Sequence, residues 1–88
     1  MKTFKDLYFE ARVNGTQATL NFDNGYGVSV ITGPFAYCDK GTYELAALKG
    51  DALYYSELTN DDVLGYLSPD EITEIMVKLQ ELPKYDSI

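Results

Sequence analysis

Histidine is missing from this chain, and cysteine occurs once, at Cys38, among 88 residues. Without histidine, neither a Ser-His-Asp triad nor a Cys-His pair can form, and zinc sites that combine cysteine with histidine are excluded as well. A single cysteine cannot close an intramolecular disulfide, which favours a reducing compartment. Long apolar runs are also missing, since no stretch approaches the roughly 20 residues of a membrane-spanning helix. With no signal-like stretch after Met1, we expect a cytoplasmic protein without membrane association.

Basic residues are scarce too: there are seven of them against 14 acidic residues, which gives a net charge of −7. Such a chain repels phosphate backbones and anionic membranes, so we expect no direct contact with nucleic acid. The same charge favours a partner protein with a basic surface. The simpler alternative is that the charge only keeps the protein soluble.

The acidic residues and the cysteine offer little catalytic chemistry. The densest carboxylate pairs, Asp61-Asp62 and Asp70-Glu71, stand at expected helix starts, where the helix dipole already accounts for them. Asp23-Asn24-Gly25 is too short for a calcium-binding loop and is explained by a turn. Cys38 is either a thiol made reactive by nearby Lys40 or an incidental small residue. We therefore predict no enzymatic activity, no metal and no cofactor.

The first half of the chain has the pattern of strands joined by glycine turns. Apolar residues alternate with polar ones from Leu7 to Val13, and Asn14-Gly15 follows as a strong two-residue hairpin signal. This turn predicts a register that pairs Val13 with Thr16, Ala11 with Ala18, Phe9 with Leu20 and Leu7 with Phe22. All the apolar pairs then share one face, so the turn and the hydrophobic pattern agree.

The second turn, Asp23-Asn24-Gly25, is expected to be a three-residue loop with Gly25 left-handed at a bulge. That loop pairs Phe22 with Tyr26, Leu20 with Val28 and Ala18 with Val30, and so matches the apolar faces. A two-residue Asn-Gly loop would instead pair Leu20 with Ser29 and set the apolar residues on opposite faces. The three-residue loop is therefore preferred.

The segment from Gly33 to Gly41 has no period and contains Pro34, so we predict an exposed connection that carries Phe35 and Tyr37. A fourth strand, about 42–48, is apolar on both faces, which predicts a more buried strand. A fifth, about 52–56, follows a turn at Lys49-Gly50-Asp51. Its Tyr54 and Tyr55 lie on opposite faces, so we expect one of them to point outward.

The character of the sequence changes at Thr59. Thr59-Asn60-Asp61-Asp62 resembles a helix start, and Val63, Leu64 and Leu67 would supply the apolar side of a short helix. Ser68-Pro69-Asp70-Glu71 is a capping box with proline at the first helical position. It predicts a long helix that ends before Pro83. Its apolar stripe consists of Ile72, Ile75, Met76, Leu79 and Leu82.

Tyrosine is abundant, with eight copies, and these cannot all lie in one small core. Tyrosine is enriched in protein interfaces because it supplies contact area at low entropic cost. The alternative is that the aromatic residues cover a second, minor core. Our candidate partner-binding residues are Tyr8, Phe35, Tyr37, Asp39 and Tyr54.

Three stretches resemble a known group of proteins. They are Asp23-Asn24-Gly25-Tyr26-Gly27-Val28-Ser29-Val30-Ile31, Tyr43-Glu44-Leu45-Ala46 and Asp62-Val63-Leu64-Gly65-Tyr66-Leu67-Ser68. Similar stretches occur in short acidic accessory proteins encoded by tailed phages and prophages of enteric bacteria. The resemblance covers roughly residues 4–82. It implies a phage origin, a bacterial host cytosol and an accessory role, and it carries over no catalytic residue.

Taken together, the sequence predicts one α+β domain over residues 1–88. An antiparallel sheet of four to five strands (about 5–57) carries a short and a long C-terminal helix (about 60–66 and 69–82) on one face. We expect a small phage protein that binds a host protein and inhibits a defence or nucleic-acid-processing complex, as anti-CRISPR proteins do. The alternative is a homo-oligomeric phage protein without inhibitory activity, most simply a homodimer. Its interface would be an exposed sheet edge or a second apolar face that includes Ile31 and Leu45.

Overall fold

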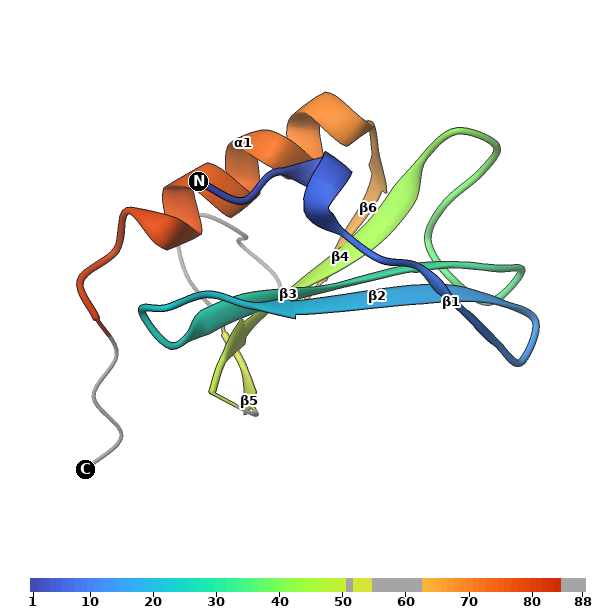
Figure 1. Ribbon diagram of the computed structural model, residues 1–88. Helices are drawn as coiled ribbons and strands as arrows, with labels where there is room; N and C mark the ends of the chain where they lie inside the picture. Colours follow the sequence, from blue (N-terminus) through green and yellow to red (C-terminus); the bar gives the residue numbers. More distant parts are fainter. Residues whose placement is uncertain (51, 55–62, 85–88) are drawn as a thin grey trace.

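The computed structural model describes residues 1–50, 52–54 and 63–84. Within them, one antiparallel sheet carries one α-helix on one of its faces (Figure 1), which confirms the predicted α+β class. The elements are η1 (Phe4–Asp6), β1 (Glu10–Arg12), β2 (Gly15–Asn21), β3 (Tyr26–Thr32), β4 (Tyr43–Lys49), β5 (Ala52–Leu53), β6 (Leu64–Leu67) and α1 (Pro69–Gln80). No helix in the described part of the chain is long and apolar enough to span a membrane.

The sheet follows the chain as a meander in the order β1-β2-β3-β4. The far edge of β4 is shared: β6 pairs with its first half and β5 with its end, at Leu48 and Lys49. Within the described residues, the sheet therefore has six strands but is five strands wide. Since β4 has neighbours on both edges, the prediction of a more buried fourth strand is confirmed by Leu45 and Ala47, which are fully buried.

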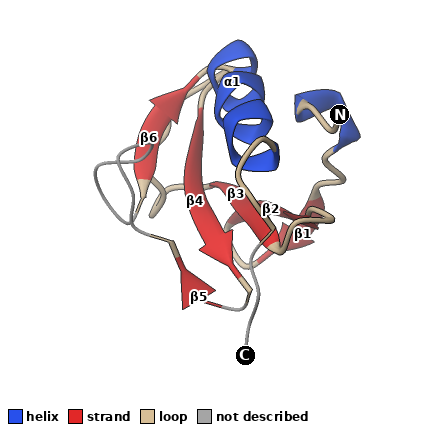
Figure 2. Ribbon diagram, turned by 90° about the vertical axis from the view of Figure 1, so that its left-hand side faces the viewer, coloured by secondary structure: helices blue, strands red, loops and turns tan. Residues whose placement is uncertain are grey.

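The core lies between α1 and the sheet face beneath it (Figure 2). Alternate residues of the two central strands belong to it, among them Val28 and Val30 of β3 and Leu45 and Ala47 of β4. The predicted helix stripe is confirmed, because Ile72, Met76 and Leu79 are fully buried, while Ile75 and Leu82 pack against the same core. The buried cluster consists of Phe22, Tyr26, Val28, Val30, Leu45, Ala47, Leu67, Ile72, Met76 and Leu79.

Helix α1 is closed at its start by the predicted capping box. The Glu71 N–H donates to Ser68 Oγ at 3.2 Å, and the Ser68 N–H donates to Glu71 Oε1 at 3.0 Å. At the other end, a turn of the sheet supplies the cap: Asn24 Nδ2 donates to the carbonyl of Leu79 at 2.8 Å and to that of Leu82 at 3.1 Å. The β2–β3 turn thereby supplies a donor to one carbonyl in the last turn of α1 and to one just beyond the helix, where donors from within the helix run out.

Replacing Asn24 by alanine is expected to lower the free energy of unfolding by about 1–3 kcal/mol, because the carbonyls of Leu79 and Leu82 lose this side-chain donor in a half-buried site. Urea unfolding followed by circular dichroism measures the loss. Asp23→Ala is the matched control, since Asp23 is the exposed neighbour in the same turn. Equal losses for the two variants would contradict this role of Asn24.

The N-terminal segment closes one end of the core. The rings of Phe4, Phe9 and Tyr43 lie 5.1–5.9 Å apart between centroids, and the Phe4 N–H donates to Thr73 Oγ1 of α1 at 3.1 Å. At the start of η1, the Thr3 N–H donates to Asp6 Oδ2 and holds the pKa of this carboxyl below its ordinary value of 3.8. This exposed contact favours the folded state at neutral pH and is lost as the pH falls through the lowered pKa.

The second hairpin has the predicted register. Leu20 lies opposite Val28 and Ala18 opposite Val30, and the Phe22 N–H donates to the Tyr26 carbonyl at 2.7 Å. Gly25 is left-handed, with φ of 90°. The three-residue loop is therefore confirmed, because it alone matches the apolar faces of the two strands.

The register predicted for the first hairpin is wrong by two residues. Arg12 lies opposite Gly15 and Ala11 opposite Thr16, so the loop is Val13-Asn14, with Asn14 left-handed at φ 62°. Gly15 belongs to β2, where a Cβ would stand 2.0 Å from the Thr32 carbonyl oxygen. The glycine thus serves the close approach of β2 to β3 rather than the turn.

The predicted short helix at about 60–66 is wrong where the structure describes it, since Leu64–Leu67 forms β6; its start at Thr59–Asp62 lies outside the described residues. Two steps along β4 match three steps along β6, because Tyr43 lies opposite Leu67 and Leu45 opposite Leu64. This bulge, with Tyr66 at φ 57°, brings Leu64 and Leu67 to the same core. Their spacing of three therefore imitates a helical turn.

Candidate functional site

Four large apolar side chains are exposed at one end of the sheet, and we call them the apolar tip: Val13, Phe35, Tyr37 and Tyr66. Their exposed fractions are 87%, 88%, 60% and 58%. They come from the β1–β2 turn, from the connection between β3 and β4, and from β6. In Figure 1 the turn and the connection lie together at the right-hand end of the sheet. Exposed aromatic residues gathered in this way are typical of protein-binding surfaces.

The connection that carries Phe35 and Tyr37 is held by hydrogen bonds along its length. The Tyr37 N–H donates to Glu44 Oε1 at 2.8 Å, and the Ala36 N–H donates to the Gly33 carbonyl at 3.1 Å. Thr42 Oγ1 donates to Asp39 Oδ1 at 2.7 Å, and the Asp39 N–H donates to the same hydroxyl at 2.8 Å. The backbone beneath the exposed rings is therefore fixed before any partner arrives, which reduces the entropic cost of binding.

Contacts between backbones hold the segments of the tip together. The Tyr66 N–H donates to the Tyr37 carbonyl at 2.8 Å, and Gly65 faces Tyr37 so closely that a Cβ would stand 2.5 Å from that of Tyr37. On the other side, Val13 and Phe35 line one shallow hollow of about 70 Å³. The four side chains of the tip therefore belong to one continuous surface.

Gly33 is where the β1–β2 turn touches the connection. Its φ is 136°, and a Cβ there would stand 2.2 Å from the Asn14 carbonyl oxygen, which is backbone. Gly41, at the other end of the connection, has φ of 85° but nothing within 4 Å of a Cβ. Both glycines therefore adopt a positive φ, but only at Gly33 would a side chain collide with a neighbouring backbone.

This difference allows a matched pair of substitutions. Gly41→Ala is expected to cost about 1 kcal/mol for its positive φ, whereas Gly33→Ala adds the clash with Asn14 and costs about 2 kcal/mol more. Thermal or urea unfolding of the two variants measures both losses. If Gly33→Ala were as stable as Gly41→Ala, the turn and the connection would not be packed as described.

The structure brings together three of the five sequence-predicted site residues: Phe35, Tyr37 and Asp39 all lie on the connection and are exposed. Tyr8 is 80% exposed but lies before β1, away from these three. Tyr54 is half-buried, with its ring 5.0 Å from that of Tyr26 between centroids, so it packs on the core instead of joining the tip. Its neighbour Tyr55 lies outside the described residues.

Sequence reasoning missed Val13 and Tyr66. The alternating pattern places Val13 on the apolar face of the first strand, but the loop lies one residue earlier than predicted and takes Val13 into the turn. The predicted short helix includes Tyr66, whereas in the structure Tyr66 lies at the bulge of β6 and is exposed. The Leu-Gly-Tyr-Leu order was the available signal, because glycine weakens a helix and often marks a bulge in a strand.

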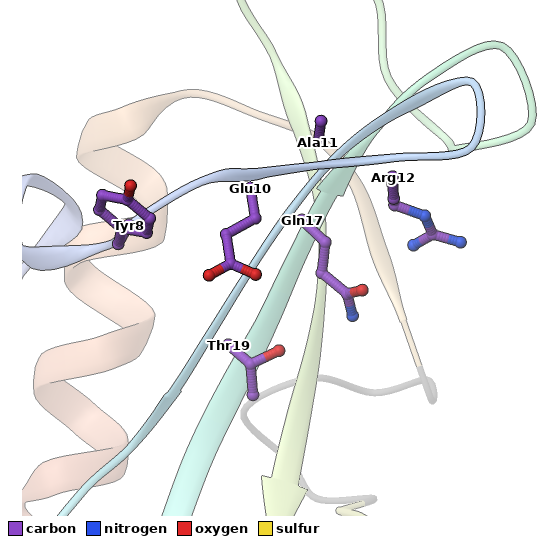
Figure 3. A pocket seen from close by; sticks show the side chains of 6 residues that line it. All are labelled: Tyr8, Glu10, Ala11, Arg12, Gln17 and Thr19. Carbon is purple, nitrogen blue, oxygen red and sulfur yellow. The ribbon is translucent and has the colours of Figure 1, made fainter.

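A second shallow hollow, of about 260 Å³, lies beside β1 and β2 (Figure 3). Glu10, Arg12, Gln17 and Thr19 point to the same side of the two strands there, and Ala11 points to the other. This side is the sheet face that α1 does not cover. Arg12 also lines the hollow at Val13 and Phe35, so the two hollows adjoin along β1.

The other groups that the sequence singled out are Cys38 and the two acidic pairs. Cys38 is half-buried, with its Sγ 3.8 Å from the Gly33 carbonyl oxygen. Of the acidic pairs, Glu71 caps α1 and Asp70 is exposed beside it, while Asp61-Asp62 lies outside the described residues. Among residues 1–50, 52–54 and 63–84, no three cysteine or carboxylate side chains gather where a metal ion would bind.

The charge around the tip is balanced, not acidic. Arg12 and Lys40 stand near it together with Asp39 and Glu44. The described residues hold nine of the 14 acidic side chains and all seven basic ones. Five of the 14 acidic residues therefore lie outside the described part of the chain, and the tip itself is mainly apolar.

The chain matches no protein-family model, and the comparisons with curated proteins and with solved structures found no match. The fold and the tip define a small α+β domain with an exposed, internally braced aromatic surface at one end of its sheet.

Proposed function

We propose that this chain is a protein-binding module that docks on a host protein through the apolar tip. The observation that carries the proposal is the exposure of Phe35 and Tyr37 on a connection whose backbone is fixed by hydrogen bonds. Exposed phenyl and phenol rings are costly in water unless a partner covers them. Tyrosine and arginine are also the residues that dominate binding energy in interfaces, and both occur here.

The partner that suits this surface has an apolar pocket or groove for Phe35, bordered by polar groups. Asp39 and Lys40 at the rim of the tip would set the orientation, because exposed charges contribute more to specificity than to affinity. Under the resemblance to phage accessory proteins, the partner is a host protein of the cytosol. Covering a working surface of a defence or nucleic-acid-processing complex would be enough to inhibit it.

A pull-down from host lysate tests the proposal with the intact chain as bait. We expect the unmodified chain to retain a host protein in a saturable manner, and the double variant Phe35→Ser with Tyr37→Ser to retain none. Leu53→Ser is the control, since Leu53 is a 44% exposed apolar residue of β5 at the opposite end of the sheet. Retention of no host protein at low salt, or equal retention by the tip variant, would refute the proposal.

A further inference from the structure

The outer edge of β1 has no partner strand among the described residues. β1 is the end strand of the sheet, and all three of its residues are exposed. An open edge presents unpaired N–H and C=O groups at every second residue, and such an edge is a template for another strand. Edges are commonly protected by charged side chains, and β1 carries two, Glu10 and Arg12.

The arrangement of these two charges is self-complementary. When two copies of β1 run antiparallel about a two-fold axis at Ala11, Glu10 of one copy lies opposite Arg12 of the other, and the reverse. Both side chains point to the same side of the sheet (Figure 3), as opposed residues of paired strands must. Neither makes an ion pair or a side-chain hydrogen bond within the described part of its own chain. Opposite charges directly across a strand pair stabilise it.

The neighbouring symmetric registers lack this match. An axis at Glu10 sets two glutamates face to face, and an axis at Arg12 sets two arginines face to face, and like charges directly opposite destabilise a strand pair. The axis at Ala11 also brings Phe9 opposite Val13 of the second copy. Val13 is exposed in the single chain, and in the dimer part of its apolar surface would be removed from water.

We propose that a second copy of this chain pairs with the β1 edge, in the register centred on Ala11, and extends the sheet across a two-fold axis. The interface is isologous, because each copy contributes the same residues. Val13 belongs both to this interface and to the apolar tip, whereas Phe35, Tyr37 and Tyr66 lie outside this register. Substitutions of these three residues therefore distinguish docking at the tip from the dimer.

Sedimentation velocity over a range from about 1 µM to about 1 mM tests the register with charge exchanges. We expect a dimer for the unmodified chain, and at least about tenfold weaker association for Glu10→Arg or Arg12→Glu, each of which opposes like charges. The double exchange, Glu10→Arg with Arg12→Glu, restores the opposite charges and is expected to restore the dimer. Circular dichroism checks that each variant keeps the fold.

Two further variants test whether the β1 edge, and not another surface of the chain, forms the dimer. Glu74→Arg makes the same charge change on the exposed side of α1 and is expected to leave the dimer unchanged, as is Phe35→Ser at the tip. A monomer at every concentration would overturn the proposal. So would single exchanges that associate like the unmodified chain, or a folded double exchange that stays monomeric.

Discussion

Met76→Ala is expected to lower the free energy of unfolding by about 3 kcal/mol, within the range of about 2–5 kcal/mol for removing a large aliphatic side chain from a packed core. Met76 is fully buried in the middle of α1, between Ile72 and Leu79. The helix covers one side of the described core, so a cavity at Met76 removes contacts between the helix and the sheet. A domain of this size has only about 5–10 kcal/mol in total, so the loss is large.

Two companions isolate the cavity as the cause. Met76→Leu conserves most of the volume and is expected to cost less than about 1.5 kcal/mol. Glu74→Ala, on the exposed side of the same helix, is expected to change stability by less than about 0.5 kcal/mol. Urea unfolding measures the free energy of unfolding of all three variants. The slope of this free energy against urea concentration should be the same for each. A loss below about 1 kcal/mol for Met76→Ala would mean that α1 does not cover the sheet as described.

Phe35→Ala is expected to weaken binding of the retained host protein by about 30-fold or more, the loss typical of a central aromatic anchor. The stability of the chain itself should stay within about 0.5 kcal/mol, because the Phe35 side chain makes few contacts in its own fold. Calorimetric titration of the purified pair measures the affinity, and urea unfolding measures the stability. This separation of binding from folding is what distinguishes an interface residue from a core residue.

Comparable substitutions elsewhere give the contrast. Leu53→Ala, at the far end of the sheet, should leave the affinity unchanged. Tyr66→Ala is expected to weaken binding less than Phe35→Ala, since Tyr66 is the less exposed of the two rings. If Phe35→Ala bound as tightly as the unmodified chain while Leu53→Ala did not, the binding surface would lie at the other end of the sheet.

Elements with a clear local signal were predictable from the sequence. The capping box at Ser68 and the stripe from Ile72 to Leu82 required only helical periodicity, and both are confirmed. The β2–β3 register followed because only one loop length matches the apolar faces of the two strands. In each case, local propensity and tertiary packing favour the same structure.

Elements decided by backbone contacts were not predictable. The Asn14-Gly15 signal pointed to a turn, but Gly15 is required beside Thr32 of β3, a residue well separated from it along the chain. The Leu64 and Leu67 spacing pointed to a helix, whereas pairing with β4 through a bulge explains the same spacing. Because of these two errors, two members of the apolar tip were not predicted. Val13 is exposed because it lies in the turn, and Tyr66 is exposed at the bulge of β6.

The most direct test of the apolar tip as a binding surface maps the residues that the host partner covers. Backbone amide signals of the isotope-labelled chain are compared before and after the partner is added. We expect the largest changes on the β1–β2 turn at Val13, on the connection at Phe35 and Tyr37, and on Tyr66, while the exposed side of α1 is unaffected. Changes confined to the exposed side of α1, with the signals of the connection unmoved, would contradict docking through the tip.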